Sequence, residues 1–296
     1  MINDEKKYNT IIEYILENAK KYRDRPALIS GRKAYTYGEL IEQATLAARR
    51  LHIAGVKRGD RIAVNLEHSE RFVIAVLAVL MNGAAYVPVD LRTPKVRIEQ
   101  IIRQSNIKKM IAVEESEING ADTLLMEELL SESGLNSDFE KEYSDYGDGE
   151  SEAYVIFTSG TTGNPKGIPI RNKSVINLVN AFRKWLNPKC DGESAVVHKI
   201  LLMASFSFDM SVFQMFYALV AGQTLDILPD GIKEDPAGFL DYITEHGITV
   251  TDTTPLYLDA LSEIVSIGNV KYKLPEIVIT SGEALPPATA KRWFEL

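Results

Sequence analysis

Residues 153–167 of this 296-residue sequence read AYVIFTSGTTGNPKG. Residues 153–157 form a short apolar run that is typical of a buried strand. Residues 158–165 are all Gly, Ser, Thr, Asn or Pro, and Lys166 and Gly167 follow them. Glycines let backbone N–H groups converge on an anion, hydroxyl groups donate hydrogen bonds, and lysine supplies positive charge. The stretch therefore predicts a strand followed by a loop that binds phosphate oxygens.

The loop is not a Walker A motif, which requires G-x4-G-K-[ST], because the fifth residue after Gly160 is Pro165 instead of glycine. A flexible linker is the simpler alternative, but a linker would not place an apolar segment, 168–170, directly after the loop. We therefore favour a phosphate-binding loop. Its candidate residues are Thr158, Ser159, Gly160, Thr161, Thr162, Gly163, Lys166 and Gly167.

The composition limits the class of protein. The net charge is −8, and no basic cluster offsets it, which argues against a nucleic-acid partner. The single cysteine, Cys190, excludes an internal disulfide and fits a reducing, cytoplasmic location. The four histidines show no metal-ligand spacing. The longest apolar run, 72–81, is too short to span a bilayer and predicts a buried helix, so no membrane partner is expected.

Strand and helix patterns alternate along most of the chain, which predicts an α/β fold with parallel sheets flanked by helices. Strands are expected at 26–30, 61–66, 84–90, 109–113, 153–157, 224–228 and 248–252. Residues 200–209 are expected to form a strand that runs into a turn, and residues 276–285 a strand that ends in small residues. Helices are expected at 8–22, 40–54, 69–82, 94–105, 172–185, 210–220, 236–246, 255–266 and from 286 to the end. Ser69 and Asn172 are the expected N-caps of their helices. Because the last helix has no closing glycine and no strand after it, the chain is expected to end inside a larger domain.

The pattern T-S-G-T-T-G-x-P-K-G resembles the signature of adenylate-forming (AMP-binding) enzymes, which include the amino acid adenylation domains of nonribosomal peptide synthetases, acyl-CoA synthetases and firefly luciferase. Further stretches are similar to family segments in the same order. Residues 34–40 resemble L-T-Y-x-E-L, and residues 80–90, LMNGAAYVPVD, are similar to L-K-A-G-x-A-Y-x-P-x-D with departures at Met81, Asn82 and Ala84. FDMS, 208–211, matches F-D-x-S, and SGEALP, 281–286, is similar to G-G-E-A-L-P.

The resemblance implies the N-terminal part of one adenylation domain over residues 1–296, with a luciferase or acetyl-CoA synthetase-like fold truncated before its β-barrel subdomain. It implies two adjoining lobes with mainly parallel sheets. One, about 59–188, contains the phosphate loop; the other, 8–58 plus 189–296, contains the substrate pocket. The implied reaction converts ATP and an amino acid to aminoacyl-AMP and pyrophosphate. The aminoacyl group then passes to the phosphopantetheine thiol of a carrier-protein domain.

The resemblance also assigns site residues and leaves some out. Thr158 and Lys166 would be the catalytic residues within the 296 residues, and Gly282, Glu283 and Ala284 would lie along the adenine of ATP. The substrate pocket would be lined by Asp209, Met210, Phe213, Asp252, Ile279 and Ser281. The family motif Y-G-P-T-E, which supplies the acidic ligand of Mg²⁺, and the C-terminal catalytic lysine are expected beyond Leu296. The fragment alone is therefore expected to be inactive.

Four of these assigned residues have plainer alternatives. An Asp after a hydrophobic strand is often only a helix N-cap, although the family match favours Asp209 as the partner of the substrate's α-amino group. Asp252 could receive a basic or hydroxylated side chain, or cap the following helix. Met210 and Phe213 could be ordinary core residues. For the whole chain, the rival hypotheses are a non-catalytic module that binds nucleotide or a partner protein and, within the superfamily, an acyl-CoA synthetase.

Overall fold

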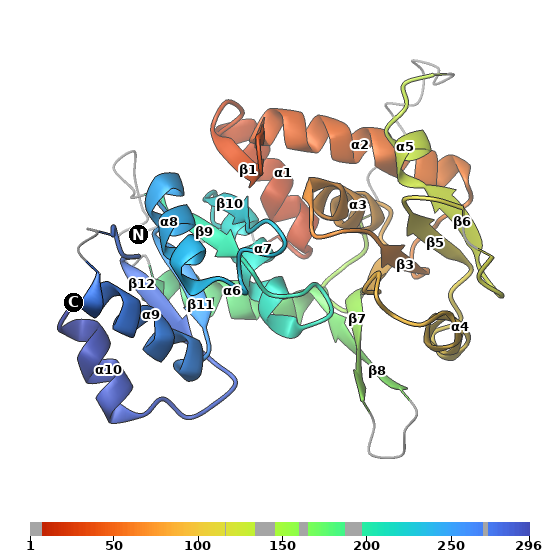
Figure 1. The fold of residues 1–296 in the computed structure, drawn as a ribbon. Coiled ribbons are helices and arrows are strands. Elements are labelled where there is room, and N and C mark those ends of the chain that lie inside the picture. Colours follow the sequence, from red (N-terminus) through yellow and green to blue (C-terminus); the bar gives the residue numbers. More distant parts are fainter. Residues whose placement is uncertain (1–7, 116, 134–145, 160–164, 187–196, 269–271) are drawn as a thin grey trace.

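Two six-stranded sheets and the helices between and around them make up the molecule (Figure 1). The computed structural model describes residues 8–296 except 116, 134–145, 160–164, 187–196 and 269–271. The first sheet has the strand order β12-β11-β9-β10-β1-β2, and the second β6-β5-β3-β4-β7-β8. Neighbouring strands are parallel in both sheets, except for the antiparallel pairs β1–β2 and β7–β8 at one edge of each. The α/β class with mainly parallel sheets is confirmed.

The first sheet is built from both ends of the described chain, and the second from the segment between them. The strands of the first sheet are β1 (Pro26–Ser30), β2 (Lys33–Thr36), β9 (Lys199–Leu202), β10 (Thr224–Ile227), β11 (Val250–Thr253) and β12 (Ile277–Thr280). Those of the second are β3 (Arg61–Asn65), β4 (Ala85–Pro88), β5 (Lys109–Ala112), β6 (Asp122–Leu125), β7 (Glu152–Ser159) and β8 (Pro165–Arg171).

The helices follow the sequence pattern closely. They are α1 (Ile11–Lys21), α2 (Tyr37–Ile53), α3 (Glu70–Met81), α4 (Lys95–Gln104), α5 (Met126–Leu129), α6 (Asn172–Leu186), α7 (Asp209–Val220), α8 (Pro236–His246), α9 (Pro255–Ile267) and α10 (Pro287–Phe294). The apolar run 72–81 is a buried helix, as predicted. None of the helices within the described residues is long and apolar enough to cross a membrane.

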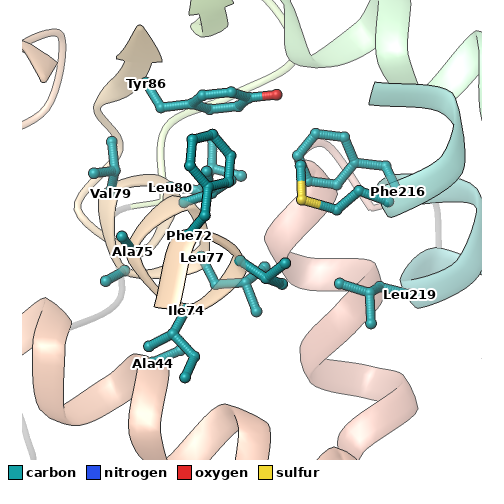
Figure 2. Close-up of a cluster of buried hydrophobic side chains, with 14 of the residues drawn as sticks. Ala44, Phe72, Ile74, Ala75, Leu77, Val79, Leu80, Tyr86, Phe216 and Leu219 are labelled. Atoms are coloured by element: carbon teal, nitrogen blue, oxygen red, sulfur yellow. The ribbon is translucent and has the colours of Figure 1, made fainter. Parts of the chain in front are cut away.

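The main hydrophobic core joins the two sheets. It contains buried residues of α1, α2, α3 and α7 together with inward-facing residues of both sheets. Figure 2 shows its centre, where Phe72 of α3 lies below Tyr86 of β4 and faces Phe216 of α7. Two smaller cores lie on the outer faces of the sheets, one under α4 and one under α8 and α9. Because α3 and α7 are apolar almost all round, each can be covered on every side, as helices between two sheets must be.

Several local predictions need correction. Strand β6 and the short helix α5 were not expected. Ser69 occupies the N-cap position of α3, but its side chain makes no capping hydrogen bond. Asn172 is the first residue of α6 rather than its cap: its Oδ1 accepts from the Ile11 N–H at 3.1 Å, and its Nδ2 donates to the Ser151 carbonyl at 3.1 Å. A short polar side chain can serve distant backbone groups as readily as its own helix, and only the tertiary structure decides between them.

Candidate functional site

The predicted phosphate-binding segment lies on a β-hairpin. Strand β7 continues to Ser159, and the chain returns antiparallel from Pro165, with Thr158 opposite Lys166 and Phe157 opposite Gly167. Figure 1 shows this hairpin projecting beyond the rest of the molecule. The prediction of a loop over 158–167 was wrong at both of its ends, because residues 158–159 and 165–167 belong to the paired strands. β-Branched Thr158 fits a strand, and pairing with 165–167 lengthens β7 by satisfying its backbone groups.

The structure places only part of this segment. Gly160, Thr161, Thr162 and Gly163 lie outside the described residues, as does Cys190. Thr158 and Lys166 are exposed.

Gly167 has a packing reason to be glycine. A Cβ added there would lie 2.8 Å from Cζ of Phe157, so the absence of a side chain lets the ring cross the hairpin. Its role toward phosphate stays a prediction.

Asp209 begins α7 and does not cap it. Phe208 occupies the N-cap position without a side-chain hydrogen bond, and the Ser211 hydroxyl donates to the Phe208 carbonyl at 2.7 Å. The Asp209 carboxylate is exposed, and no other described residue donates a hydrogen bond to it. It lies close enough to β7 to add, after burial, to the raised pKa of Tyr154, which is about 12. A carboxylate is favoured at a helix N-terminus and here keeps its full capacity to accept hydrogen bonds.

Asp252 ends up buried beside α7. It lies in β11, only 8% exposed, and accepts a hydrogen bond from Gln214 Nε2. Burial raises the pKa of Asp252 to about 6. The alternative that Asp252 caps the next helix is excluded, because Thr254 occupies the N-cap of α9 and accepts from the Tyr257 N–H at 3.3 Å.

The other predicted pocket residues lie on the same two elements or next to them. Ile279 of β12 pairs in register with Asp252, and the Ser281 N–H donates to the Thr253 carbonyl at 3.1 Å. Met210 is half-buried against the main core, whereas Phe213 is 4% exposed and packs against the Phe182 ring with a centroid distance of 4.1 Å.

The structure thus brings Asp252, Ile279 and Ser281 together at the carboxyl ends of β11 and β12. Phe213 is a core residue in this structure. The predicted adenine-binding residues Gly282, Glu283 and Ala284 follow β12 and are exposed, with Gly282 at a φ of 85° that favours glycine.

A cavity of about 610 Å³ lies at the carboxyl ends of β3, β4, β9 and β10. Its lining includes Glu67, His68, Asp90, Phe206, Phe208 and Lys233, none of which was a predicted site residue. His68 joins the sheets here: Nδ1 lies 3.2 Å from the Leu228 carbonyl and Nε2 3.2 Å from that of Ala204. Sequence reasoning missed this cavity, although the carboxyl ends of parallel strands are where ligands collect.

Sequence reasoning also missed Gln214, which is 1% exposed. Its Oε1 accepts from the Ala204 N–H at 3.2 Å while its Nε2 donates to Asp252. A polar residue within the apolar 210–220 pattern was the signal that could have identified it.

Comparison with known proteins identifies the family of the chain. The chain matches the family model "AMP-binding enzyme" over residues 15–296. It is 30% identical to syringomycin synthase SyrB1 of Pseudomonas syringae pv. syringae over 96% of the chain and 45% of that protein. It is 33% identical to tyrocidine synthase 1 of Brevibacillus parabrevis over 94% of the chain and 24% of that protein. The chain therefore spans less than half the length of these relatives.

The fold matches solved structures of the same kind. The N-terminal subdomain of Klebsiella oxytoca NpsA in complex with 3-hydroxybenzoyl-AMSN aligns with a TM-score of 0.82 at 22% identity, over 97% of this chain and 70% of that one. The nonribosomal peptide synthetase FmoA3 aligns with a TM-score of 0.81 at 22% identity, over 96% of this chain and 29% of that one. With the fold, the motifs and the family model in agreement, the chain belongs to the AMP-binding enzyme family.

Proposed function

We propose that this chain carries the amino-acid and nucleotide sites of an adenylation reaction. In that reaction an amino acid carboxylate attacks the α-phosphate of ATP, forms an aminoacyl-adenylate and releases pyrophosphate. The observation that carries the proposal is the Asp209 carboxylate, which lies at the start of α7 without capping it. An exposed carboxylate at a helix N-terminus, with no capping hydrogen bond to make, suits the α-ammonium group of an amino acid.

The chain's residues would position two anions and require no covalent nucleophile. Thr158 and Lys166 face each other at the end of the hairpin, where a hydroxyl and an ammonium group would hold phosphate oxygens. The exposed turn at Gly282 would lie along the adenine. Magnesium would neutralise charge on the leaving pyrophosphate. The described residues contain no group of three or more acidic, His or Cys side chains suited to a metal, so we assign no magnesium ligand among them.

The names of the relatives suggest the later step. The relatives include syringomycin, surfactin and tyrocidine synthases, and NpsA-ThdA is an artificially fused adenylation-PCP di-domain. We infer that the parent enzyme of this chain transfers its aminoacyl group to a carrier-protein thiol. Whether the 296 residues alone complete the adenylation step can be tested by amino acid-dependent ATP–pyrophosphate exchange, and we expect them to show none.

Binding of adenylate analogues tests the proposal directly. Calorimetric titration would use aminoacyl sulfamoyl adenosines and matched acyl analogues that lack the α-amino group. Asp209→Ala should weaken the aminoacyl analogues by about two to three and a half decades, since losing one partner of a desolvated ion pair costs about 3–5 kcal/mol. It should leave the acyl analogues unchanged. Equal binding of aminoacyl and acyl analogues by the unmodified chain would indicate an acyl substrate instead.

The chain offers a matched control at another helix start. Asp235 is the N-cap of α8 and accepts from the Ala237 N–H at 3.1 Å. Asp235→Ala should lower the free energy of unfolding by about 1 kcal/mol without changing analogue affinity. Asp209→Ala should lower the affinity for the aminoacyl analogues and leave the free energy of unfolding nearly unchanged, because no capping hydrogen bond is lost.

A further inference from the structure

A second cavity, of about 580 Å³, lies at the other end of the second sheet. It is lined by the first residues of β3, β4, β5 and β7 and by residues in the links that precede β3 and β5, 55–60 and 105–108. Strand β7 spans the distance to the hairpin: Glu152 at its start lines the cavity, and Ser159 at its end is about 23 Å away along an extended strand. The cavity is therefore separate from the proposed adenylation site.

Positive charge gathers in this cavity, although the whole chain carries a net charge of −8. The lining holds five cationic side chains against two carboxylates: Lys57, Arg58, Arg61, Lys108 and Lys109 against Asp60 and Glu152. The sequence shows no basic cluster, because these cations come from separate segments that the fold brings together. A hollow lined mainly by one sign of charge raises the local concentration of counter-ions. The cavity is therefore suited to an anion.

The two arginines of the cavity already have acidic partners. Arg61 donates to both oxygens of Glu152, through Nη2 at 2.7 Å and through Nε at 2.8 Å. Arg58 Nη2 lies 2.6 Å from an oxygen of Asp148. The positive charge that is left without a close partner therefore belongs to the lysines.

The three lysines keep their ammonium groups available. Lys57 and Lys108 are exposed, and neither side chain forms an ion pair or hydrogen bond with another residue in the described part of the chain. Lys109 lies 3.5 Å from Asp122, whose side chain is 81% exposed, and an ion pair so open to water is weak. The Asp60 carboxylate accepts the backbone N–H of Lys57 at 2.9 Å, not its ammonium group.

A plainer role for these lysines would be to satisfy the last carbonyl groups of α2 and α4, which end beside the cavity. Backbone groups already do this. The N–H groups of residues 54–56 donate to the carbonyls of 50–52, and those of 105–107 donate to the carbonyls of 101–103. These helix ends therefore do not need the lysine side chains.

We propose that this cavity is a second anion site, which binds a small polyanion of the diphosphate kind through Lys57, Lys108 and Lys109. Strands β3 and β5 are neighbours in the sheet, so the links that precede them bring the three ammonium groups to one cavity. Several positive charges around one hollow suit a ligand with several negative charges. The inference does not depend on the proposed function.

Titration of the ¹⁵N-labelled chain with inorganic pyrophosphate, without magnesium, tests both anion sites at once. The amide signals of Gly59 and Asn106, which line the cavity, should shift and reach saturation, while Gly167 reports on the hairpin. Replacing two charges by Lys57→Gln with Lys108→Gln should weaken binding at the cavity about tenfold. Binding there should also weaken as NaCl rises from about 50 to about 300 mM.

The matched control is Lys95→Gln with Lys291→Gln, which removes the same charge from exposed lysines on α4 and α10. It should leave the affinity at the cavity unchanged; equal weakening by both pairs would show a response to net charge alone and overturn the inference. Shifts at Gly167 without shifts at Gly59 and Asn106 would overturn it and support the hairpin as a phosphate site. Saturable shifts at the cavity without any at Gly167 would support this inference and count against the phosphate role of the hairpin.

Discussion

A buried carboxylate costs free energy, and Asp252 shows that cost at the scale of a single residue. Its place at the end of an apolar strand was evident from the sequence, and so was its need for a partner. The identity of that partner was not, because Gln214 lies on another element and meets Asp252 only after α7 packs on the sheet. The same applies to Asp209. The sequence alone left open whether Asp209 caps a helix or binds the substrate's ammonium group, and the structure excludes the capping role because Phe208 occupies the N-cap position of α7.

The raised pKa of Asp252 predicts how stability varies with pH. The folded carboxyl group has a pKa of about 6, above the value of about 3.9 of an unfolded chain, so the folded state binds more protons between these values. The contribution of Asp252 to stability is therefore greatest below about pH 4 and falls as pH rises through 6. Asp252→Asn should be more stable than the unmodified chain at pH 7.5, by up to about 3 kcal/mol, and equal to it at pH 4. Urea unfolding of both proteins at the two pH values measures this; a difference that does not vary with pH would contradict it.

At the scale of the elements, hydrophobic pattern and capping signals predicted most helices and strands, because α3, α7 and the parallel strands are buried on both sides. The hairpin was missed because Pro165 to Arg171 carries Pro and Gly, which favour loops locally. Pairing with β7 overrides that preference. Long-range polar contacts were also missed, because they form only when distant segments pack together. Asn172 is the clearest example: its side chain hydrogen-bonds both the start of α1 and the residue before β7.

Asn172→Ala tests that contact. Alanine is a good helix former, so α6 itself should not suffer. The Ile11 N–H would lose its partner in a buried site, and the free energy of unfolding should fall by about 1–3 kcal/mol. Thr10→Ala is the companion variant. It removes the capping box at the start of α1 and should lower the free energy of unfolding by about 1 kcal/mol. If denaturant unfolding shows no loss for Asn172→Ala, water replaces the amide and the contact does not stabilise the fold.

At the scale of the whole molecule, the two sheets face a shared core, and the predicted site residues lie at the carboxyl end of β7, the start of α7, and the ends of β11 and β12. The alternation of strand and helix patterns predicted the α/β class, but it could not give the strand order, the contacts of His68 with Leu228 and Ala204, or the stacking of Phe206 on Phe72. These depend on packing between segments far apart in the chain. The cavity of about 610 Å³ arises from the same packing, which is why no motif pointed to it.

We propose that the hairpin, Asp209 and the β11–β12 ends form one site for an aminoacyl-adenylate. A crystal structure of the chain with the best-binding aminoacyl sulfamoyl adenosine tests it most directly. We predict the α-ammonium group about 3 Å from the Asp209 carboxylate, the side chain toward Asp252, and the sulfamoyl group beside Thr158 and Lys166. An analogue seated instead in the cavity between Glu67 and Lys233, with Asp209 untouched, would contradict the account.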